Sequence, residues 1–305
     1  MPSATSRKTD ARASPESLLS EGSHSGHRGL PQSLPRSSKK DEILNRQRST
    51  FSLCDVAFDV AERPILAPLT LEIPIDGQVL GLIRHNGSGK STFLKLLARQ
   101  QMPTSGSITL NGRRLDTWGD RALARKVAYL AQHLPSAAGM TVRELVSLGR
   151  YPWQGAFGRF GEVDRQKTEE AIALTGVAPL ADRLVATLSG GERQRAWLAM
   201  LVAQDTEYLL LDEPISALDI SHQIEVLSLV RKLSQEKGLG IIIVLHDINM
   251  ASRFCDTITV LHSGRVIIQG ASETIMTPEA LQRIYGLPMD VMIHEPTGKP
   301  LAIAR

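Results

Sequence analysis

Short apolar segments separated by turn residues run through the chain from residue 51 onward, and they predict strands. The segments are FSLCDVAF, PLTLEIPI, QVLGLI, SITLNGRRL, VAYLAQ, YLLLD and GIIIVLHD. YLLLD and GIIIVLHD are apolar at nearly every position, which is typical of strands buried on both faces of a parallel sheet. Helical spacing occurs instead in KSTFLKLLARQ and through most of residues 141–203. This order predicts an α/β core that carries a helical insertion.

Residues 1–48 differ from the rest of the chain in composition. They are rich in Ser, Arg, Lys and Pro, and the first aromatic residue is Phe51. Such a segment buries too little apolar surface to offset the entropy lost on ordering, so we interpret it as a disordered tail. A transit peptide is an alternative that acidic residues weaken, namely Asp10, Glu16, Glu21, Asp41 and Glu42. A further alternative is that translation starts at a later residue and that this segment is not translated.

The composition is that of an ordinary globular protein. Of the 305 residues, 42% are hydrophobic and 22% charged, which suits one folded domain over residues 49–290 and an extension over residues 291–305. The net charge of +3 is too small to indicate nucleic acid binding by itself. The two cysteines exclude a disulfide framework and a cysteine metal cluster, and we expect both to be buried. No apolar run reaches the roughly 18 residues that span a bilayer, so any membrane role would be peripheral.

The stretch GLIRHNGSGKST, residues 81–92, follows a predicted strand and opens a predicted helix. This is the context of a phosphate-binding loop, whose pattern is G-x-x-x-x-G-K-[ST]. Small residues let backbone N–H groups surround phosphate oxygens, Lys90 adds a full positive charge, and Ser91 offers a hydroxyl to Mg²⁺. The residues expected at the phosphates are His85, Asn86, Gly87, Ser88, Gly89, Lys90, Ser91 and Thr92.

Arg84 departs from this pattern, because it occupies the place of the first glycine. Two outcomes are open. The backbone angles at residue 84 suit a side chain that points to solvent or to an acidic neighbour, or the side chain clashes with adjacent strands at a cost of about 1–3 kcal/mol. A recent substitution or a sequence error is a further alternative, since glycine and arginine codons can differ by one base.

The apolar strand YLLLDEP ends in two carboxylates, Asp212 and Glu213. A buried strand that delivers Asp212 beside the phosphate loop gives Mg²⁺ a ligand, directly or through water. Glu213 can then act as the general base that polarises an attacking water molecule.

A second glycine-rich segment, LSGGERQ at residues 188–194, precedes another apolar helix and forms a second candidate anion site. One ATP has no use for two such sites in one chain, whereas two chains arranged head to tail would use both. The segment resembles the LSGGQ signature of the ATP-binding cassette (ABC) family, with Glu192 in place of the glutamine. The resemblance implies that Ser189, Gly190 and Gly191 contact the γ-phosphate held by a second copy of the chain, in a nucleotide-sandwich dimer.

Further positions match the same family. Gln132 resembles the glutamine that senses Mg²⁺ and the attacking water, Asp219 ends a SALD segment that resembles the D-loop, and His246 resembles the switch histidine at the γ-phosphate. The resemblance implies a P-loop NTPase with a RecA-like core, an antiparallel β subdomain and a helical signature subdomain at about residues 134–200. Two departures concern Val60, which stands where many cassettes stack an aromatic residue on adenine, and Ile215, which replaces a threonine beside Glu213.

The segment GMTVRELVSLGRYPWQGAFGRFG at residues 139–161 lies in the predicted helical subdomain. Its GRYPW and GRFG blocks, together with LSGGERQRAWLAMLVAQ and LHDINMA, resemble the ATPases of ferric siderophore importers. Aromatic and arginine residues alternate there, and they would face the permease; these are Arg143, Arg150, Tyr151, Trp153, Phe157, Arg159 and Phe160. The resemblance implies an ATP- and Mg²⁺-dependent subunit on the cytoplasmic face of a bacterial inner membrane. Its partners would be a second copy, polytopic permease subunits and, indirectly, a periplasmic or surface siderophore-binding protein, but no nucleic acid.

Several alternatives stay open. The cargo could be a hydroxamate-type siderophore, another iron chelate, haem or cobalamin, because this subunit does not touch the cargo. Arg84 and Ile215 also allow a cassette that dimerises but barely hydrolyses ATP. A nucleic-acid or ribosome ATPase is a third class, although the long coiled coil or the second nucleotide site of such proteins is missing from this sequence.

Substituting Arg84→Gly tests the phosphate loop. If Arg84 impairs the site, the substitution should tighten ATP binding, by about tenfold for a strain of 1–2 kcal/mol. Equilibrium titration with ATP measures the change, and an unchanged dissociation constant would contradict the impairment. A parent turnover comparable to that of the variant would exclude the binding-only cassette.

Overall fold

A six-stranded sheet lies at the centre of the computed structural model, which describes residues 50–61, 63–74, 76–83, 89–154 and 158–305. Its strand order is β10 (Arg265–Ala271), β9 (Thr257–His262), β3 (Val79–Ile83), β8 (Gly240–Leu245), β7 (Tyr208–Leu211) and β6 (Val127–Leu130). The strands from β9 to β6 are parallel, and β10 pairs antiparallel with β9. Parallel neighbours need crossover connections, and the segments between them supply helices for this purpose.

The parallel strands are buried on both faces, as their uninterrupted apolar sequences predicted. In β8, Ile241 and Ile243 belong to one hydrophobic core, and Ile242 and Val244 to the other. Successive strand side chains point to opposite faces, so one continuous apolar run can fill two cores. Burying each such side chain contributes roughly 1.5–3 kcal/mol, and this burial fixes the register of the strand ends.

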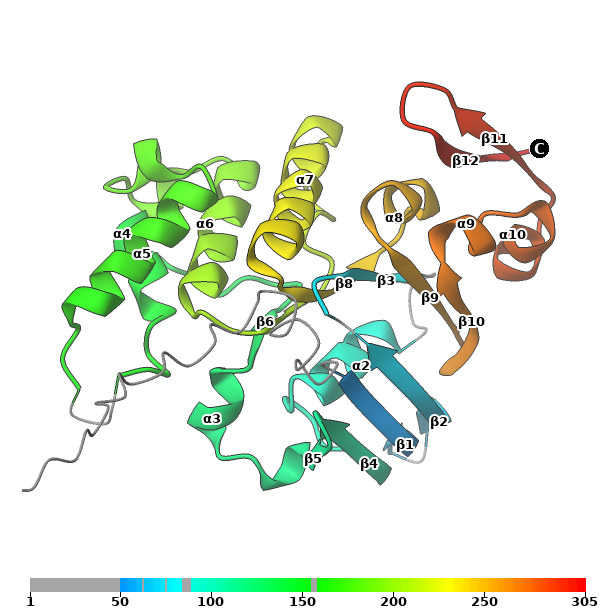
Figure 1. Cartoon of the computed structure of the whole chain (residues 1–305), viewed down its shortest axis with the longest axis horizontal. Helices are drawn as coiled ribbons and strands as arrows, with labels where there is room; N and C mark the ends of the chain where they lie inside the picture. The colour runs from blue at the N-terminus through cyan, green and yellow to red at the C-terminus, as the bar shows by residue number, and fades with distance from the viewer. Residues whose placement is uncertain (1–49, 62, 75, 84–88, 155–157) are drawn as a thin grey trace, which may run out of the picture. The chain divides into compact units, whose positions relative to one another are not determined.

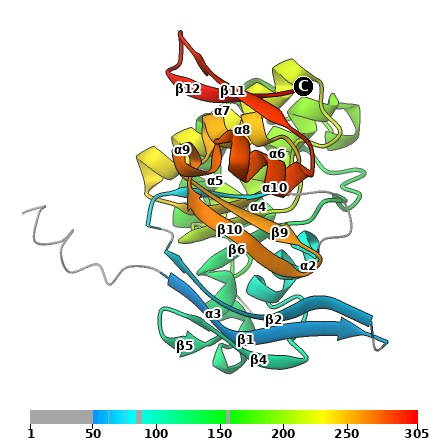
Figure 2. The ribbon, with the colours of Figure 1, turned by 90° about the vertical axis from the view of Figure 1, so that its right-hand side faces the viewer.

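A second sheet and one helix cover the core that contains Ile242. The sheet runs in the order β2 (Arg63–Pro74), β1 (Thr50–Val60), β4 (Ser105–Leu110) and β5 (Arg113–Arg114), and all its pairs are antiparallel (Figure 2). Helix α2 (Lys90–Leu97) contributes Phe93, Leu94 and Leu97 to the same core. The short α3 (Asp120–Ala124) follows before β6. The antiparallel β subdomain is therefore confirmed.

Three helices form a group between β6 and β7: α4 (Val142–Leu148), α5 (Glu162–Leu174) and α6 (Gly190–Ala203) (Figure 1). Thr141 begins α4 with a reciprocal capping box, in which its hydroxyl accepts from the Glu144 backbone and the Glu144 carboxylate accepts from the Thr141 backbone. Short 3₁₀ turns at Ala178–Leu180 and Val185–Thr187 connect α5 to α6. This group is the helical subdomain that the sequence predicted.

The segment GRYPW joins the helical group to the central sheet. The guanidinium of Arg150 is buried, donates to the carbonyl of Ala203 at 2.8 Å and pairs with Asp164 at 2.9 Å. The guanidinium carbons of Arg125 and Arg150 lie 4.9 and 5.3 Å from the centroid of the Trp153 ring. Arg125 precedes β6 and donates to the carbonyl of Pro152 at 2.9 Å, so the Arg125 contacts cross from the helical subdomain to the core, whereas those of Arg150 stay within α5 and α6.

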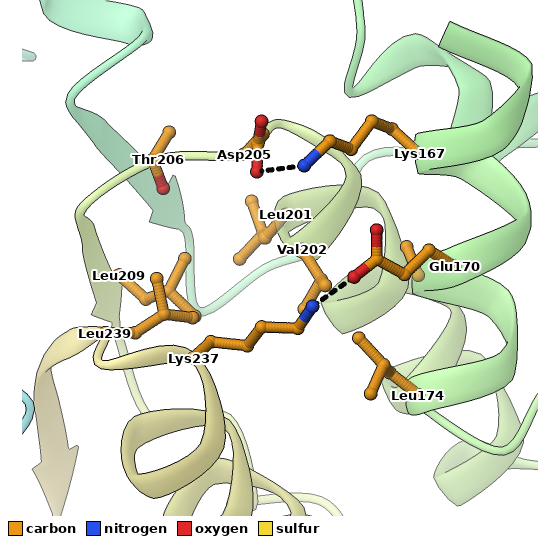
Figure 3. Close-up of a pocket in the computed structure, with 11 residues that line it drawn as sticks. Lys167, Glu170, Leu174, Leu201, Val202, Asp205, Thr206, Leu209, Lys237 and Leu239 are labelled. Carbon is orange, nitrogen blue, oxygen red and sulfur yellow. Dashed lines mark hydrogen bonds and ion pairs between the residues drawn. The ribbon is translucent and has the colours of Figure 1, made fainter. Parts of the chain in front are cut away.

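A second junction between the helical subdomain and the core lies along α5 (Figure 3). Lys167 pairs with Asp205 at 2.9 Å, and Glu170 pairs with Lys237 at the end of α7 (Ile220–Lys237). A small pocket between the two ion pairs has a floor of leucine side chains, contributed by Leu174, Leu201, Leu209 and Leu239. Because its charged groups pair with one another, this pocket has no free charge to offer a phosphate.

The C-terminal part adds three helices and a hairpin. They are α8 (Ile248–Phe254), α9 (Ser272–Ile275), α10 (Pro278–Tyr285), and the antiparallel pair β11 (Met289–His294) and β12 (Lys299–Ala304). One expectation is wrong, since Cys54 on β1 is exposed and only Cys255 is buried. The side chain of Cys54 lies at a strand position that faces solvent, which composition alone does not reveal. Among the described residues no helix is long and apolar enough to cross a bilayer.

Substituting Gly149→Ala tests the packing of α4 on α6. A Cβ atom at residue 149 would lie 2.1 Å from the carbonyl oxygen of Met200, which is backbone and cannot rotate away. We expect a loss of about 1–3 kcal/mol in the free energy of unfolding, measured by urea denaturation. Gly119→Ala is the matched control, because Gly119 also has a negative φ and has open space around it. Equal stability of the two variants would contradict this account.

Candidate nucleotide-binding site

A pocket opens where β3, β6, β7 and β8 end, which is the edge at which parallel α/β sheets bind ligands. Its described lining residues are Arg63, Ile65, Gly89, Lys90, Ser91, Thr92, Gln132, Glu213, Ser216 and His246. Seven of the sequence-predicted site residues thus meet at one place: Gly89, Lys90, Ser91, Thr92, Gln132, Glu213 and His246. They come from four separate segments of the chain.

The N-terminus of α2 faces this pocket. Gly89 precedes the helix with φ of +90°, and a Cβ atom there would lie 2.9 Å from the carbonyl oxygen of Ile65, so only glycine fits. Its carbonyl accepts from Phe93 N at 2.8 Å and starts the helix. Lys90 is the first helical residue and is only 4% exposed. The partial positive charge of a helix N-terminus and the lysine charge both favour an anion here.

Asp212 is buried directly behind Ser91. The Ser91 hydroxyl donates to one carboxylate oxygen at 3.0 Å, and the Tyr129 hydroxyl donates to the other at 3.3 Å. Burial raises the pKa of Asp212 above its ordinary value, and the neighbouring charge of Glu213 acts in the same direction. The two hydroxyls that donate to the carboxylate are neutral, so a cation bound beside them would stabilise its negative charge.

Glu213 lies in the left-handed region with φ of +50°, which is unfavourable for a residue with a side chain. One carboxylate oxygen accepts from Gln132 Nε2 at 2.7 Å, and the other lies 2.8 Å from His246 Nε2. Gln132 follows β6 and His246 follows β8, the two strands on either side of β7. The three candidate catalytic residues therefore meet because three neighbouring parallel strands end together.

The signature segment lies outside this set of lining residues. Ser189 caps α6 by accepting from Glu192 N, and the Glu192 carboxylate accepts from Ser189 N at 2.9 Å. These hydrogen bonds lower the pKa of Glu192. Ser189 and Gly190 are exposed. Glu192, the departure from the family glutamine, therefore has a local role, because it completes a capping box.

Asp219 begins α7 in the same way. It accepts from His222 N at 3.0 Å and from the Ser221 hydroxyl at 2.9 Å, which lowers its pKa to about 2. The His222 ring in turn packs against Gly191, where a Cβ atom would lie 2.3 Å from the ring. Gly191 and Asp219, from two different predicted motifs, are thus joined through His222.

Some predicted residues cannot be placed. Arg84, His85, Asn86, Gly87, Ser88 and Phe157 lie outside the described residues. Val60, the expected adenine position, is half exposed and is not among the described lining residues, whereas Arg63 and Ile65 are. Ile215 is buried in the hydrophobic core, and the hydroxyl of Ser216 donates to the Glu213 carbonyl at 3.2 Å.

The sequence reasoning missed Tyr129 and Ser216. Tyr129 lies on β6 opposite Leu210, three residues before Gln132, so its hydroxyl reaches the end of β7. A polar ring inside an apolar strand was the available signal, since a half-buried tyrosine hydroxyl needs a partner. Burial and the nearby Asp212 charge raise the pKa of Tyr129, so it stays a hydrogen-bond donor.

Comparison with known proteins agrees with this arrangement. The ABC transporter family profile matches residues 66–216. The ferric enterobactin transport ATP-binding protein FepC of Escherichia coli is 43% identical over 235 residues, which are 77% of this chain and 86% of FepC. The iron(3+)-hydroxamate import ATP-binding protein FhuC of Bacillus subtilis is 40% identical over 255 residues, 84% of this chain and 94% of FhuC. A dimeric structure of a bacterial ABC transporter cassette has a TM-score of 0.64 at 27% identity and covers 73% of this chain and 98% of that chain.

The parallel sheet, with a helix N-terminus and an acidic strand end at one edge, defines a P-loop type of ATPase. The chain belongs to the ATP-binding subunits of ABC transporters, and it binds and hydrolyses ATP.

Substituting Tyr129→Phe tests the hydroxyl that contacts Asp212. Partners of a ligating carboxylate typically contribute 10–100-fold to metal affinity, so we expect the Mg²⁺ concentration for half-maximal ATPase activity to rise about tenfold. Tyr208→Phe makes the same chemical change on β7, where the hydroxyl donates to Asn111 instead. Equal Mg²⁺ dependence in the two variants would show that the Tyr129 contact is not needed.

Proposed function

We propose that this chain is the ATP-hydrolysing subunit of a bacterial importer of iron(III)–siderophore complexes, with separate permease subunits in the membrane. The observation that carries the proposal is that Gln132 and His246 both contact the carboxylate of Glu213. This group lies beside the Ser91–Asp212 pair. The import direction and the iron chelate rest on the names of the two relatives described above.

Lys90, Ser91 and Asp212 would hold the phosphates of ATP and Mg²⁺. The oxygen donors of Ser91 and Asp212 are of the kind that Mg²⁺ prefers, and the two side chains are in direct contact. Among the described residues no three His, Cys, Asp or Glu side chains cluster to hold a metal by themselves. Mg²⁺ here would also bind phosphate oxygens of the nucleotide, and it would offset charge that develops on them.

Glu213 would accept a proton from the attacking water as general base. Its two oxygens already have partners in Gln132 and His246, but each carboxylate oxygen has a second acceptor position. Those two partners fix the direction of the free positions, which is the orientation that catalysis requires. His85, Asn86, Gly87, Ser88, Gly89 and Thr92 would complete the phosphate contacts.

A second copy of the chain would supply Ser189, Gly190, Gly191 and Asp219. Within one chain the described lining of the Lys90 pocket does not include them, although Ser189 and Gly190 are exposed at the start of a 14-residue helix. A helix N-terminus that is exposed and separate from the pocket can serve the nucleotide of another copy. The similar cassette of known structure is dimeric, which supports this arrangement.

The helical subdomain would face the permease, at the cytoplasmic side of the inner membrane. Tyr151 is 67% exposed and Phe160 41%, and both lie in the segment that follows α4. Trp153 differs, because its indole N–H donates to the carbonyl of Gln204 at 2.6 Å and its ring stacks on two arginines. Tyr151 and Phe160 would thus contact the permease, whereas Trp153 would hold their segment in place. A periplasmic or surface siderophore-binding protein would act on the permease rather than on this chain.

The cargo within this class is a finer proposal. We favour a hydroxamate-type siderophore because FhuC, the relative of that name, matches over 84% of this chain. FepC carries the name of enterobactin, and its sequence identity to this chain is slightly higher. Because this subunit would not touch the cargo, the permease and the binding protein would decide which chelate is carried. Haem and cobalamin are alternatives for the same reason.

Substituting Glu213→Gln tests the hydrolytic role. Removing a general base typically costs 10²–10⁴-fold, so we expect ATP turnover to fall at least about a hundredfold while ATP binding persists. Glu207→Gln is the control, since Glu207 lies at the other end of β7 and pairs with Lys126 on the surface. Unchanged turnover in the Glu213 variant would refute this assignment.

The same variant tests the transport role. With ATP present it should remain in the closed dimer and co-purify from bacterial membranes with a polytopic permease, identified by mass spectrometry. Recovery of ribosomes or nucleic acid in place of a permease would contradict the importer.

A further inference from the structure

The C-terminal hairpin is attached to α8 by an unusual use of one side chain. Asn249 Nδ2 donates to the carbonyl of Ala302 at 3.1 Å, and Ala302 N donates to Asn249 Oδ1 at 2.7 Å. The side-chain amide thus makes the two hydrogen bonds to β12 that a neighbouring strand would make. The N–H and the carbonyl of Ala302 therefore point to Asn249 rather than to β11. Ala302 is only 7% exposed.

Two buried serines extend the same contact. The Ser252 hydroxyl donates to the carbonyl of Pro300 at 3.2 Å, and the Ser272 hydroxyl donates to the carbonyl of Ser252 at 3.2 Å. Ser252 is fully buried and Ser272 is 1% exposed. Because buried hydrogen bonds are costly to break, β12 is fixed along α8 and not merely adjacent to it (Figure 2).

Helix α8 is short, and only its N-cap Asp247 separates it from His246. It spans Ile248–Phe254, seven residues, and an isolated helix of this length is unstable in water. Asp247 caps it, accepting from Asn249 N at 2.6 Å and from Met250 N at 3.2 Å. Asn249 therefore joins the cap of the helix, through its backbone, to the hairpin, through its side chain.

We propose that Asn249 is a positioning residue for ATP hydrolysis, and that the hairpin β11–β12 is part of the support of the active site. By holding β12, Asn249 fixes the first turn of α8 and so the direction in which His246 presents Nε2 to Glu213, 2.8 Å away. The inference rests on the proposed roles of His246 and Glu213. It goes beyond them because it assigns a catalytic consequence to a hairpin at residues 289–304, outside the segment 66–216 that the family profile matches.

The contact can be removed from either side in the full-length chain. Asn249→Ala removes the amide, and Ala302→Pro removes the N–H that donates to it while leaving the ladder to β11, because Ala302 faces α8. A loosened His246 affects the chemical step and not the binding of ATP by Lys90 and Ser91. We expect each variant to lower kcat about tenfold, with KM for ATP within about twofold of the parent.

The double variant and a control complete the test. If the two groups act only through each other, Asn249→Ala with Ala302→Pro should lose no more kcat than either single variant. Arg305→Ala is the matched control, because its ion pair with Asp290 lies on the exposed side of the hairpin, and it should keep the parent kcat. Two results would overturn the inference and leave the hairpin as a stabilising element only. One is a kcat within twofold of the parent in either single variant, and the other is a rise in KM for ATP as large as the fall in kcat.

His246→Ala distinguishes this failure from failure of the proposed function. If the parent hydrolyses ATP and His246→Ala abolishes the activity while the Asn249 and Ala302 variants are unaffected, only the inference fails. If His246→Ala keeps the parent activity, the role of His246 fails and the inference fails with it, whereas the proposed function fails only if the parent does not hydrolyse ATP.

Discussion

The left-handed backbone of Glu213 is the constraint on which the site depends. Along a regular strand Asp212 and Glu213 would point to opposite faces of the sheet. The positive φ at Glu213 ends the strand abruptly, so that Asp212 faces Ser91 and Tyr129 while Glu213 turns to Gln132 and His246. A conformation of this kind costs roughly 1–3 kcal/mol, and it persists because the buried strand before it and the two partners of the carboxylate define it from both sides.

The elements around the site supply the rigidity that this arrangement needs. Strands β6, β7 and β8 are in register along their length, so their ends cannot shift independently. Gly89 lets the start of α2 approach the backbone of β2, so the helix that carries Lys90 and Ser91 packs against the antiparallel sheet. The capped helices α6 and α7 are joined through Gly191 and His222. The site is therefore a meeting point of packed elements, and each contributes one or two side chains.

Much of the fold and of the site could be predicted from the sequence, and the limits have physical reasons. Uninterrupted apolar runs identified β7 and β8, because only strands buried on both faces need them. Glu213 could be assigned from the acidic end of the strand YLLLDEP, and His246 from its resemblance to the switch histidine of the family. Tyr129 could not be found in this way, since its contact with Asp212 depends on the pairing of β6 with β7. The role of Asn249 was hidden for a similar reason, because its partner Ala302 is 53 residues away and contributes only backbone.

The junction along α5 has a consequence for the stiffness of the molecule. Both ion pairs there are about one-third or more exposed, with side-chain accessibilities of 34–44% for Lys167 and Asp205 and 37% for both members of the other pair. Exposed pairs of this kind contribute less than about 1 kcal/mol each, and long lysine side chains can exchange partners as helices slide. The GRYPW junction is different, because the Arg150 guanidinium is buried. Arg150 pairs with Asp164 of α5 and donates to Ala203 of α6, so it stiffens the helical subdomain internally. The contact of α5 with the core depends instead on the two exposed ion pairs, and we expect it to be the softer of the two contacts.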